Sequence, residues 1–429
     1  MSILYLLIFL LVVIFLLRDF DKTVVYYAPF KLILHRGILL YDASSFAINL
    51  DMAVSIVAFL VFLTRSARYK NSDIPKFIMW GAIVFCIGVF VHGMNPRFAF
   101  NIFFYEPITT FSFIYVLFKV VRTKNQLSKL IKGFMIVGAI LIFDAVIDVI
   151  FGYNIITEIE KTQGGDRLWI SNNDVNRAGM IRTTSFMPHS IAMGTIAVFI
   201  WSIVIIIRFI FPKYLNVNRK LLYLIVIGLP VCMLFANSRT TILTALCFVP
   251  LFMKRSIMFS IKGFILLIGL VALVLANSTY FEWMYNSIFH ESSVNVGGST
   301  TDLRESQFTI AMYYFHQNPL LGKGVDFDVL NYENESDVMG MESVWFILFM
   351  LRGLVGVVTY VYFILTGLVS FLKYNKIFWL FTLAWLVNIT SSSQEGVSMF
   401  LYCIFIFLSY KLYYFEKESP VRRWKINIK

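Results

Sequence analysis

Apolar segments, each about as long as a bilayer is thick, recur along almost the whole chain of 429 residues. A hydrocarbon core about 30 Å thick requires roughly 20 apolar residues per helix. The chain is 59% hydrophobic and only 14% charged, which leaves room for about a dozen spans. These properties exclude a soluble multidomain protein, a disordered chain, a coiled coil and a disulfide-rich secreted module. The sequence therefore predicts an all-α polytopic membrane protein.

Apolar runs bounded by charged or turn-forming residues predict about twelve transmembrane helices. They cover residues 2–17, 46–64, 77–93, 102–121, 133–153, 188–211, 221–236, 240–253, 257–277, 353–372, 377–393 and 395–414. Between the first two spans, a mixed stretch with Pro29, Lys31, His35 and Arg36 is amphipathic. We expect this stretch to lie along the membrane interface rather than to cross it.

The net charge of +12 is unevenly distributed along the chain. With both termini in the cytoplasm, the inner loops, their flanks and a basic tail at 415–429 hold 23 of the 37 Lys and Arg residues, but only three of the 25 acids. This distribution satisfies the positive-inside rule at every inner loop. No basic stretch is interleaved with aromatics in a soluble domain, so we expect no nucleic-acid partner.

Two predicted outer loops, 154–188 and 278–342, are far longer than any inner connection. Loops longer than about 15 residues are usually functional. We therefore expect a single integral membrane domain, 1–429, that carries its site on the outer side. The loop lengths show no internal repeat, which argues against a secondary transporter.

The second long loop contains three features in a fixed order. They are Arg304 ahead of a helix-like stretch, the sequence NPLLGKG at 318–324, and Glu342-Ser343 nine residues before GLVG at 353–356. This layout resembles the O-antigen polymerase and ligase superfamily of bacterial membrane glycosyltransferases, the Wzy and WaaL proteins. In that family an arginine precedes a helix, an nPllGxG turn follows, and a His with a small polar residue stands nine residues before GxxG.

Two shorter fragments are similar to the same family. Arg239, in the sequence NSRTT at 237–241, resembles the family's SRT outer hairpin. Arg182, which precedes TTSFMP at 183–188, resembles the arginine that closes its first long loop. The resemblance covers residues 237–372 closely and the rest of the chain through topology.

The resemblance implies a GT-C-like fold of about twelve transmembrane helices, with short helices in the two long loops. It implies a metal-independent inverting glycosyltransferase that polymerises oligosaccharide repeat units of an O-antigen, capsule or exopolysaccharide. Donor and acceptor would both be glycans on undecaprenyl pyrophosphate, at the outer face of the bacterial cytoplasmic membrane. Membrane lipids and a chain-length regulator protein would be the other partners. No cofactor is expected, because the sequence has no metal-ligand cluster, P-loop or nucleotide fingerprint.

The outer arginines and one acid are the candidate catalytic groups. A pyrophosphate leaving group needs fixed cations, and arginine offers planar bidentate donors that stay charged. Arg239 and Arg304, with Arg182, are expected to hold it. Glu342 stands where many members of the family have His, and a carboxylate can replace that His as the base for the acceptor hydroxyl. Alternatively, the arginines reach lipid headgroups or pair with a nearby acid.

Other polar residues within or beside spans have two interpretations each. Asp144 and Asp148 are four residues apart and so share one helical face. One interpretation is that they bind a sugar or a cation, and the other is that they pair with an outer arginine. For Asp51 a structural role is favoured. His189 is either the start of a helix or a substrate-binding residue, and His316 is placed to contact glycan.

Two other functions stay open. The first is a ligase that moves finished glycan to a lipid A core or a protein, although the replacement of His by Glu342 favours a polymerase. The second is a flippase for lipid-linked oligosaccharides, which should show repeated halves and a charged central cavity. Polymer length in a complemented deletion strain discriminates among the three.

Overall fold

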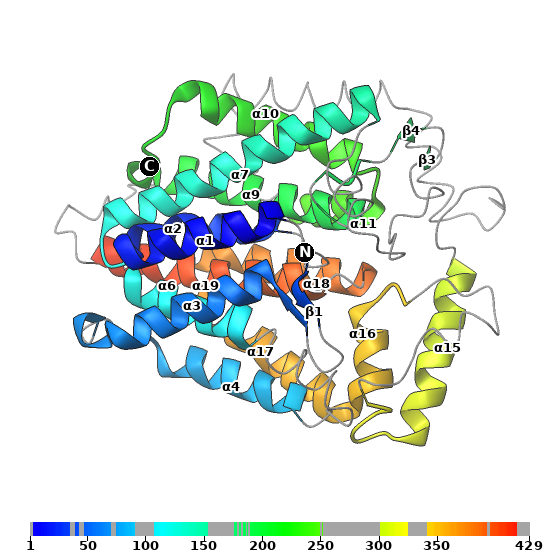
Figure 1. Cartoon of the computed structure of the whole chain (residues 1–429). Helices are drawn as coiled ribbons and strands as arrows, with labels where there is room; N and C mark the ends of the chain where they lie inside the picture. Colours follow the sequence, from blue (N-terminus) through cyan, green and yellow to red (C-terminus); the bar gives the residue numbers. More distant parts are fainter. Residues whose placement is uncertain are drawn as a thin grey trace, which may run out of the picture.

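A computed structural model of the chain describes residues 3–34, 39–42, 47–69, 74–90, 107–152, 176–177, 180–181, 183–185, 187, 189–248, 251, 301–324, 341–392 and 395–417. Within these ranges the protein is mostly helical, and its helices run side by side in one bundle (Figure 1). Four helices of the described ranges are long and apolar enough to cross a membrane, and shorter apolar helices accompany them. The four are Lys124–Phe151, Ser190–Ile210, Val344–Tyr374 and Met399–Lys417.

The first half of the bundle contains α1 (Ile3–Arg18), α2 (Phe20–Phe30), α3 (Leu50–Thr64), α4 (Lys76–Phe90), α6 (Phe113–Val120), α7 (Lys124–Phe151) and α9 (Ser190–Ile210). The second half contains α10 (Arg219–Phe235), α11 (Arg239–Leu246), α15 (Thr301–Gln317), α16 (Val344–Ile347), α17 (Gly353–Tyr374), α18 (Trp379–Ser391) and α19 (Glu395–Lys417). Short 3₁₀ turns lie at η1 (Lys31–Ile33), η2 (Ser66–Tyr69), η5 (Pro212–Tyr214) and η9 (Lys376–Phe378). Two π-helical segments, η3 (Pro107–Ser112) and η8 (Leu348–Arg352), precede α6 and α17.

Four short strands form two antiparallel pairs. Strand β1 (Leu39–Asp42) pairs with β2 (Ala47–Asn49), and β3 (Asn176–Arg177) pairs with β4 (Met180–Ile181). The second pair lies within the first long loop, close to the end of α7 (Figure 1).

The helices occupy the apolar runs that the sequence indicated, so the helical fold with membrane-spanning candidates is confirmed. The predicted span at 257–277 lies outside the described residues. Two spans begin earlier than hydropathy indicated. Helix α7 begins at Lys124 instead of 133, because Thr123 and Gln126 form a capping box ahead of its lysine-containing first turns. The helical run into α17 begins at Val344 instead of 353, where the Ser343 side chain caps α16.

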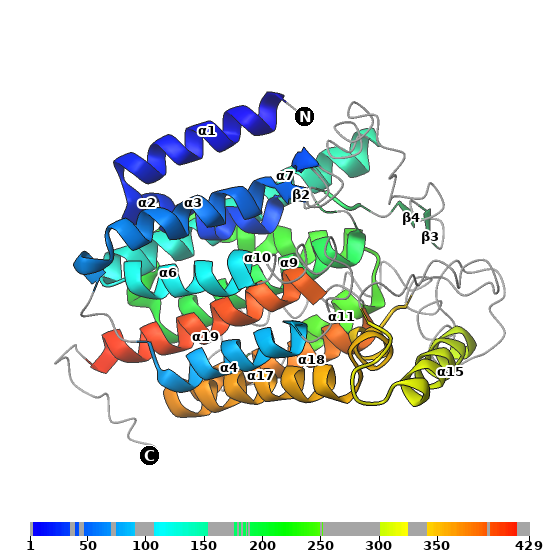
Figure 2. The same cartoon turned by 60° about the horizontal axis from the view of Figure 1, so that its bottom comes forward.

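Successive helices run between two ends of the bundle (Figure 2). We call one of them the basic end. It contains the α1–α2 turn, the end of α3, the α6–α7 turn, η5 and the end of α19, and it is marked by Arg65, Arg68, Arg122 and Lys213. We call the opposite end the loop end, because β3, β4, α15 and α16 lie there (Figure 1).

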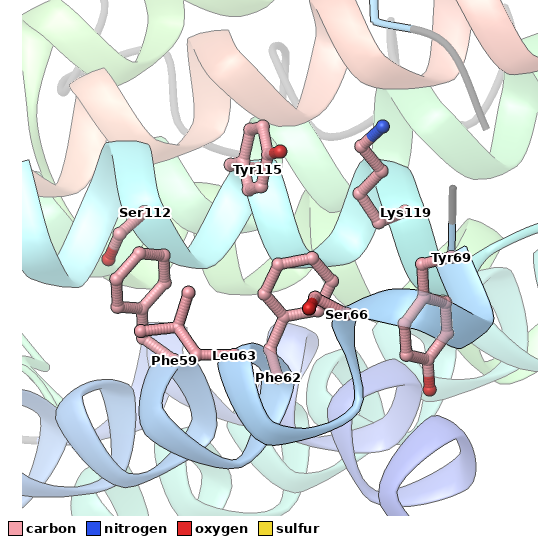
Figure 3. A pocket seen from close by; sticks show the side chains of 8 residues that line it. All are labelled: Phe59, Phe62, Leu63, Ser66, Tyr69, Ser112, Tyr115 and Lys119. Carbon is pink, nitrogen blue, oxygen red and sulfur yellow. The ribbon is translucent and has the colours of Figure 1, made fainter. Parts of the chain in front are cut away.

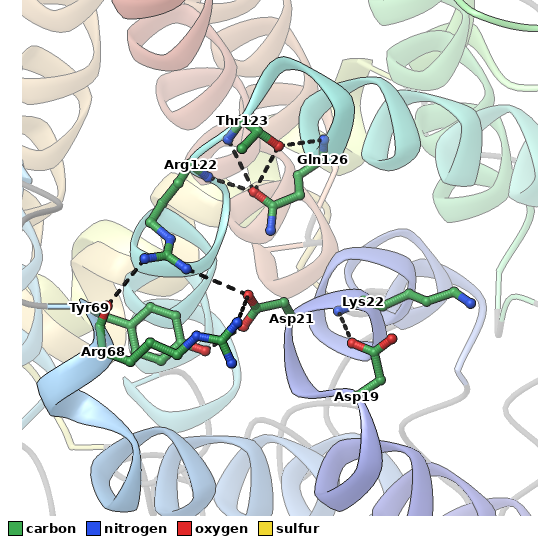
Figure 4. A network of polar contacts seen from close by, with 8 residues as sticks. All are labelled: Asp19, Asp21, Lys22, Arg68, Tyr69, Arg122, Thr123 and Gln126. Atoms are coloured by element: carbon green, nitrogen blue, oxygen red, sulfur yellow. Dashed lines mark hydrogen bonds and ion pairs between the residues drawn. The ribbon is translucent and has the colours of Figure 1, made fainter.

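A polar network ties three helix connections together at the basic end (Figure 4). Asp21 at the start of α2 accepts a hydrogen bond from the Tyr69 hydroxyl. The same carboxylate pairs with Arg68 at 3.6 Å and with Arg122 at 3.7 Å. Arg122 also donates to the Arg68 carbonyl oxygen at 3.1 Å. The network fixes α2 against η2 and the α6–α7 turn.

Helix α2 and η1, the described start of the stretch between the first two predicted spans, are packed into the bundle, so the expected position along the membrane interface is wrong for this part. His35 and Arg36 lie outside the described residues. Helix α2 packs against α1, α6 and α7. The Lys31 ammonium reaches the Asp51 carboxylate of α3 at 2.5 Å, and Ser55 at 3.0 Å, with 3% of the Lys31 side chain exposed. Pairing neutralises a cation that would be costly in an apolar core. Asp51 therefore has the structural role that the sequence favoured.

The burial of α2 also changes the direction of the first helix. Arg65 at the end of α3 donates to the Leu17 carbonyl oxygen at 2.7 Å, so α1 ends at the basic end. Helix α1 therefore starts toward the loop end, and α19 finishes at the basic end (Figure 2). Among the described residues, α1 and α3 therefore run in the same direction, and α2 lies between them in the chain. The expectation that both termini are cytoplasmic stays a prediction.

Helix α9 lies at the centre of the bundle. It is apolar all round, which is the pattern of a fully buried helix, and almost all of its length is enclosed. It packs against α7, α10, α11 and α19. Gly194 permits α11 to approach α9 closely, since a Cβ at this position would stand 2.1 Å from the Thr241 hydroxyl of α11. Asn388 of α18 donates to the Thr195 hydroxyl at 2.7 Å, which adds a buried polar tie.

Candidate functional site

The NPLLGKG turn at 318–324 follows α15 and docks on the junction between η8 and α17. Four backbone hydrogen bonds join the two segments: Lys323 N–H to Met350 O (2.8 Å), Gly324 N–H to Leu351 O (3.0 Å), Leu354 N–H to Pro319 O (2.8 Å) and Val355 N–H to Leu320 O (3.1 Å). These carbonyls and amides would otherwise pair with one another inside a continuous helix. The turn therefore satisfies the groups that the helix break at Gly353 leaves open.

This docking requires glycine on both sides. Gly322 and Gly353 have φ angles of +72° and +53°, which side chains rarely adopt. A Cβ on Gly353 would stand 2.6 Å from the Gly322 nitrogen. The two glycine motifs that the sequence singled out are therefore in direct contact.

Arg304 lies on α15, and its side chain reaches Glu342. Glu342 is the residue before Ser343, the N-cap of α16. The Arg304 Nη2 atom lies 3.5 Å from the Glu342 Oε2 atom. The side chains are 45% and 34% exposed, respectively. Two of the candidate catalytic residues, 38 positions apart, thus form one accessible ion pair at the loop end.

Gln307, for which no role was predicted from the sequence, holds the backbone of the acid in place. Its side chain is fully buried one turn after Arg304, and its Oε1 atom accepts a hydrogen bond from the Glu342 N–H at 3.2 Å. The available signal was the spacing of three residues, which puts Gln307 and Arg304 on one face of α15. A buried amide at that spacing is a positioning residue for the backbone that carries Glu342.

Arg239 is tied to the same region through the end of α18. The Trp345 indole, three residues after Glu342, donates to the Thr390 hydroxyl at 3.0 Å. Thr240, next to Arg239, donates to the Ser391 carbonyl oxygen at 3.0 Å. Arg239 is half-buried as the first residue of α11. The segments that carry Glu342 and Arg239 are thus attached to consecutive residues of α18.

Among the described residues, Asp144 and Asp148 have hydrogen-bond partners in the segment that follows position 182. Asp148 accepts hydrogen bonds from the Thr183 hydroxyl at 2.5 Å and the Thr184 N–H at 3.2 Å. Asp144 accepts one from the Ser185 hydroxyl at 2.7 Å. Both acids are buried in the last turns of α7, and they anchor the segment that follows position 182.

The two histidines are separated by the fold. His189 is the N-cap of α9, where its Nδ1 atom accepts from the Ile191 N–H at 3.1 Å, so it does start a helix. His316 is exposed in the last turn of α15, 12 residues and about three helical turns after Arg304. It therefore lies away from the Arg304–Glu342 pair.

Arg182 and the predicted span at 257–277 lie outside the described residues, as do most residues of the two long loops. Within the described ranges, no group of three or more His, Cys, Asp or Glu residues is placed to hold a metal ion.

The arrangement offers one cation and one carboxylate at an accessible helix junction, with a second arginine on a neighbouring helix. This pairing can bind an anionic group and accept a proton beside it. Comparison with known proteins adds no family assignment: no protein-family model matches the chain, and a search of curated proteins found no match.

Proposed function

We propose that the protein is a membrane glycosyltransferase that polymerises undecaprenyl-pyrophosphate-linked oligosaccharide repeat units at the outer face of a bacterial cytoplasmic membrane. The observation that carries the proposal is the contact between Arg304 and Glu342 at 3.5 Å. Support also comes from the docking of the NPLLGKG turn on the helix junction, since both belong to the family layout that the sequence resembles.

The orientation rests on charge. Basic residues are retained on the cytoplasmic side of membrane proteins. The basic end gathers Arg18, Arg65, Arg68 and Arg122 at helix ends, so we infer that it faces the cytoplasm. The loop end then faces outward, where lipid-linked repeat units are exposed. In this orientation the start of α1 faces outward, because α1 ends at the basic end.

The Arg304–Glu342 pair is suited to exchange its partner. Exposed ion pairs contribute only about 0–1 kcal/mol. A pyrophosphate, with more charge and more acceptor oxygens than one carboxylate, competes effectively for a guanidinium. Arg304 then holds the leaving group, and Glu342 is released beside the acceptor. Its carboxylate accepts the proton of the attacking sugar hydroxyl while the bond from the anomeric carbon to the pyrophosphate breaks.

Arg239 supplies a second cation from a neighbouring helix, and Arg182 a third from the first long loop. Asp144 and Asp148 position the segment after Arg182 through Thr183 and Ser185 rather than contacting sugar themselves. The lipid tails approach from the bilayer beside the bundle. The reaction requires no metal in this scheme, because arginines neutralise the leaving group.

The test is complementation of a deletion strain with Glu342→Gln, Arg304→Ala or Arg239→Ala, followed by gel analysis of polymer length. Each change is expected to collapse the ladder to single repeat units. Glu305→Gln is the matched control, since Glu305 is an exposed acid next to Arg304. Unchanged polymer in all three correctly inserted variants would overturn the assignment.

Two other results identify the alternative functions. Long polymer that stays on its lipid carrier indicates a ligase. Loss of all surface repeat units, with lipid-linked units trapped inside the cell, indicates a flippase.

A further inference from the structure

Helix α17 carries an apolar stripe on its outer face. Six side chains at helical spacing are each at least 43% exposed: Leu354, Val358, Tyr362, Leu365, Val369 and Leu372. The opposite face of the helix, which includes Tyr360 and Phe363, is buried. Helix α17 belongs to a helical run that is long and apolar enough to cross a membrane. In such a helix, an exposed apolar stripe is the surface that meets lipid.

The flank of the bundle is also apolar on α3. Phe59 and Leu63 line an open cavity of about 520 Å³ between α3 and α6 (Figure 3). Leu60 and Leu63 are 55% and 50% exposed. The polar residues Ser66 and Lys119 line the same cavity, and both lie near the basic end. The exposed apolar surface therefore occupies the middle of the bundle and gives way to polar residues at the basic end.

The stripe on α17 is slightly shorter than the hydrocarbon core of a bilayer. Its first and last residues, Leu354 and Leu372, are 18 positions apart, which is about 27 Å along a helix axis. The hydrocarbon core is about 30 Å thick. The stripe therefore leaves room for further apolar groups beyond the start of the helix, at the loop end.

The NPLLGKG turn places two leucines at this position. The N–H groups in the first turn of a helix have no partner within the helix and point out of its start. Those of Leu354 and Val355 donate to carbonyl oxygens of the turn at 2.8 Å and 3.1 Å. The turn therefore lies beyond the start of α17, next to the first residue of the stripe. Leu320 and Leu321 in the turn are 64% and 46% exposed.

Helix α15 lies across the loop end, at a steep angle to the helices of the bundle (Figure 1). It packs on the run that leads into α17, where the rings of Phe315 and Phe349 are 5.4 Å apart. Glu305 and Gln317 of α15 are exposed, so this helix lies outside the hydrocarbon core. After the turn, the Lys323 ammonium lies 5.5 Å from the centre of the Tyr314 ring. Tyrosine and lysine are residue types that anchor segments at the membrane interface.

We propose that the NPLLGKG turn inserts into the bilayer at the loop end, with Leu320 and Leu321 among the lipid acyl chains. Bilayer lipid is the occupant because the two leucines continue the stripe that a bilayer covers on α17. Helix α15 is thereby held on the membrane surface. The inference rests on the membrane-spanning fold and not on the proposed reaction.

Photocrosslinking of the full-length protein tests the proposal. The probe is p-benzoylphenylalanine, which forms a covalent bond with a neighbouring C–H group on irradiation, and it replaces Leu320 or Leu321 one at a time. The protein is placed in nanodiscs of palmitoyl-oleoyl phosphatidylethanolamine and phosphatidylglycerol, and its intact mass is measured after irradiation. The same probe at Val358, on the stripe, is the positive control. The probe at Thr309, an exposed position on α15, is the matched negative control.

At each leucine position the protein is expected to gain the mass of one phospholipid, as it does at Val358. Fragmentation of the adduct should locate the new bond on an acyl chain. Burial of a leucine side chain in an apolar environment is favoured about 10-fold to 100-fold, so the yield of adduct at Leu321 should exceed that at Thr309 by a factor of this order. A thermal melt of each variant verifies that it is folded, and the two leucine positions serve as independent tests.

Four results would overturn the proposal. An adduct yield at both leucines no higher than at Thr309, while Val358 reacts, would mean that the turn lies in water. A covalent dimer would assign the leucines to a contact with a second copy of the chain. A bond between two peptides of one chain would mean that another segment covers them. A bond to the lipid headgroup alone would place the turn outside the hydrocarbon core.

Discussion

Gly322 and Gly353 touch across 31 positions of sequence, and neither tolerates a side chain. A Cβ on Gly322 would lie 2.5 Å from the Leu351 carbonyl carbon and 2.7 Å from the Arg352 nitrogen. Backbone atoms cannot move aside as a flexible side chain can. The contact fixes how the NPLLGKG turn sits on the helix junction.

Gly322→Ala is therefore expected to destabilise the protein more than Gly324→Ala. Both glycines have positive φ, so both changes cost about 1–2 kcal/mol of backbone strain. At Gly324 a Cβ meets nothing within 4 Å, whereas at Gly322 overlap adds about 1–3 kcal/mol. Thermal unfolding in detergent measures the difference. Equal melting temperatures for the two variants would contradict the docked turn.

Asp148→Ala is expected to remove the hydrogen bond that the Thr184 N–H donates to the Asp148 carboxylate. A hydrogen bond to a charged acceptor contributes about 1.5–3 kcal/mol, so amide exchange at Thr184 should accelerate roughly 10-fold to 100-fold. Hydrogen–deuterium exchange read at that amide provides the measurement. Asp144→Ala removes only the Ser185 contact and should leave this amide protected. Equal protection in both variants would disprove the anchoring role.

The buried Lys31–Asp51 pair predicts a strongly non-additive double-mutant cycle. Lys31→Met or Asp51→Leu alone leaves an unpaired buried charge, which costs about 3–5 kcal/mol. The double variant removes both charges and should be close to the wild type in stability. Thermal melts of the four proteins complete the cycle. Additive losses would mean that the two charges are not coupled.

Alkaline pH should weaken the basic end through Tyr69. Burial first, and then the hydrogen bond to Asp21, raises the pKa of Tyr69 above its ordinary value of about 10. The folded-state pKa exceeds the unfolded one, so this stabilisation is complete below about pH 10 and is lost as the pH rises further.

Tyr69→Phe should therefore flatten the decline of melting temperature between about pH 10 and pH 11.5. Burial, and then the neighbouring Glu416, also raises the pKa of Tyr214. Part of the decline in melting temperature should therefore remain in Tyr69→Phe. Tyr223→Phe, at an exposed position, serves as the control and should leave the decline unchanged. A steeper decline in Tyr69→Phe would refute this origin.

Hydropathy predicted the positions of most described helices because their apolar runs are long and their ends are polar. It misplaced α2 because the charge on Lys31 is neutralised by Asp51, a partner on another helix that no local window includes.

The candidate site was predicted in part. Arg304, Glu342 and the glycine turns were recognisable from their order along the chain, and the fold brings them together. The positioning role of Gln307 was not predicted, because the sequence does not distinguish a buried glutamine from an exposed one. The partners of Asp144 and Asp148 were missed because hydroxyl donors in a loop have no periodicity that would reveal them.

At the NPLLGKG turn, backbone hydrogen bonds between two segments replace those of a continuous helix, and this has a mechanical consequence. Four backbone bonds join the turn to the segment 350–355, so α15 and the helical run formed by α16 and η8 make one stiff bracket. Arg304 stands on one arm of this bracket, and Glu342 lies at the start of the other. The bracket keeps their backbones at a constant separation, so the pair opens by rotation of side chains and not by movement of helices.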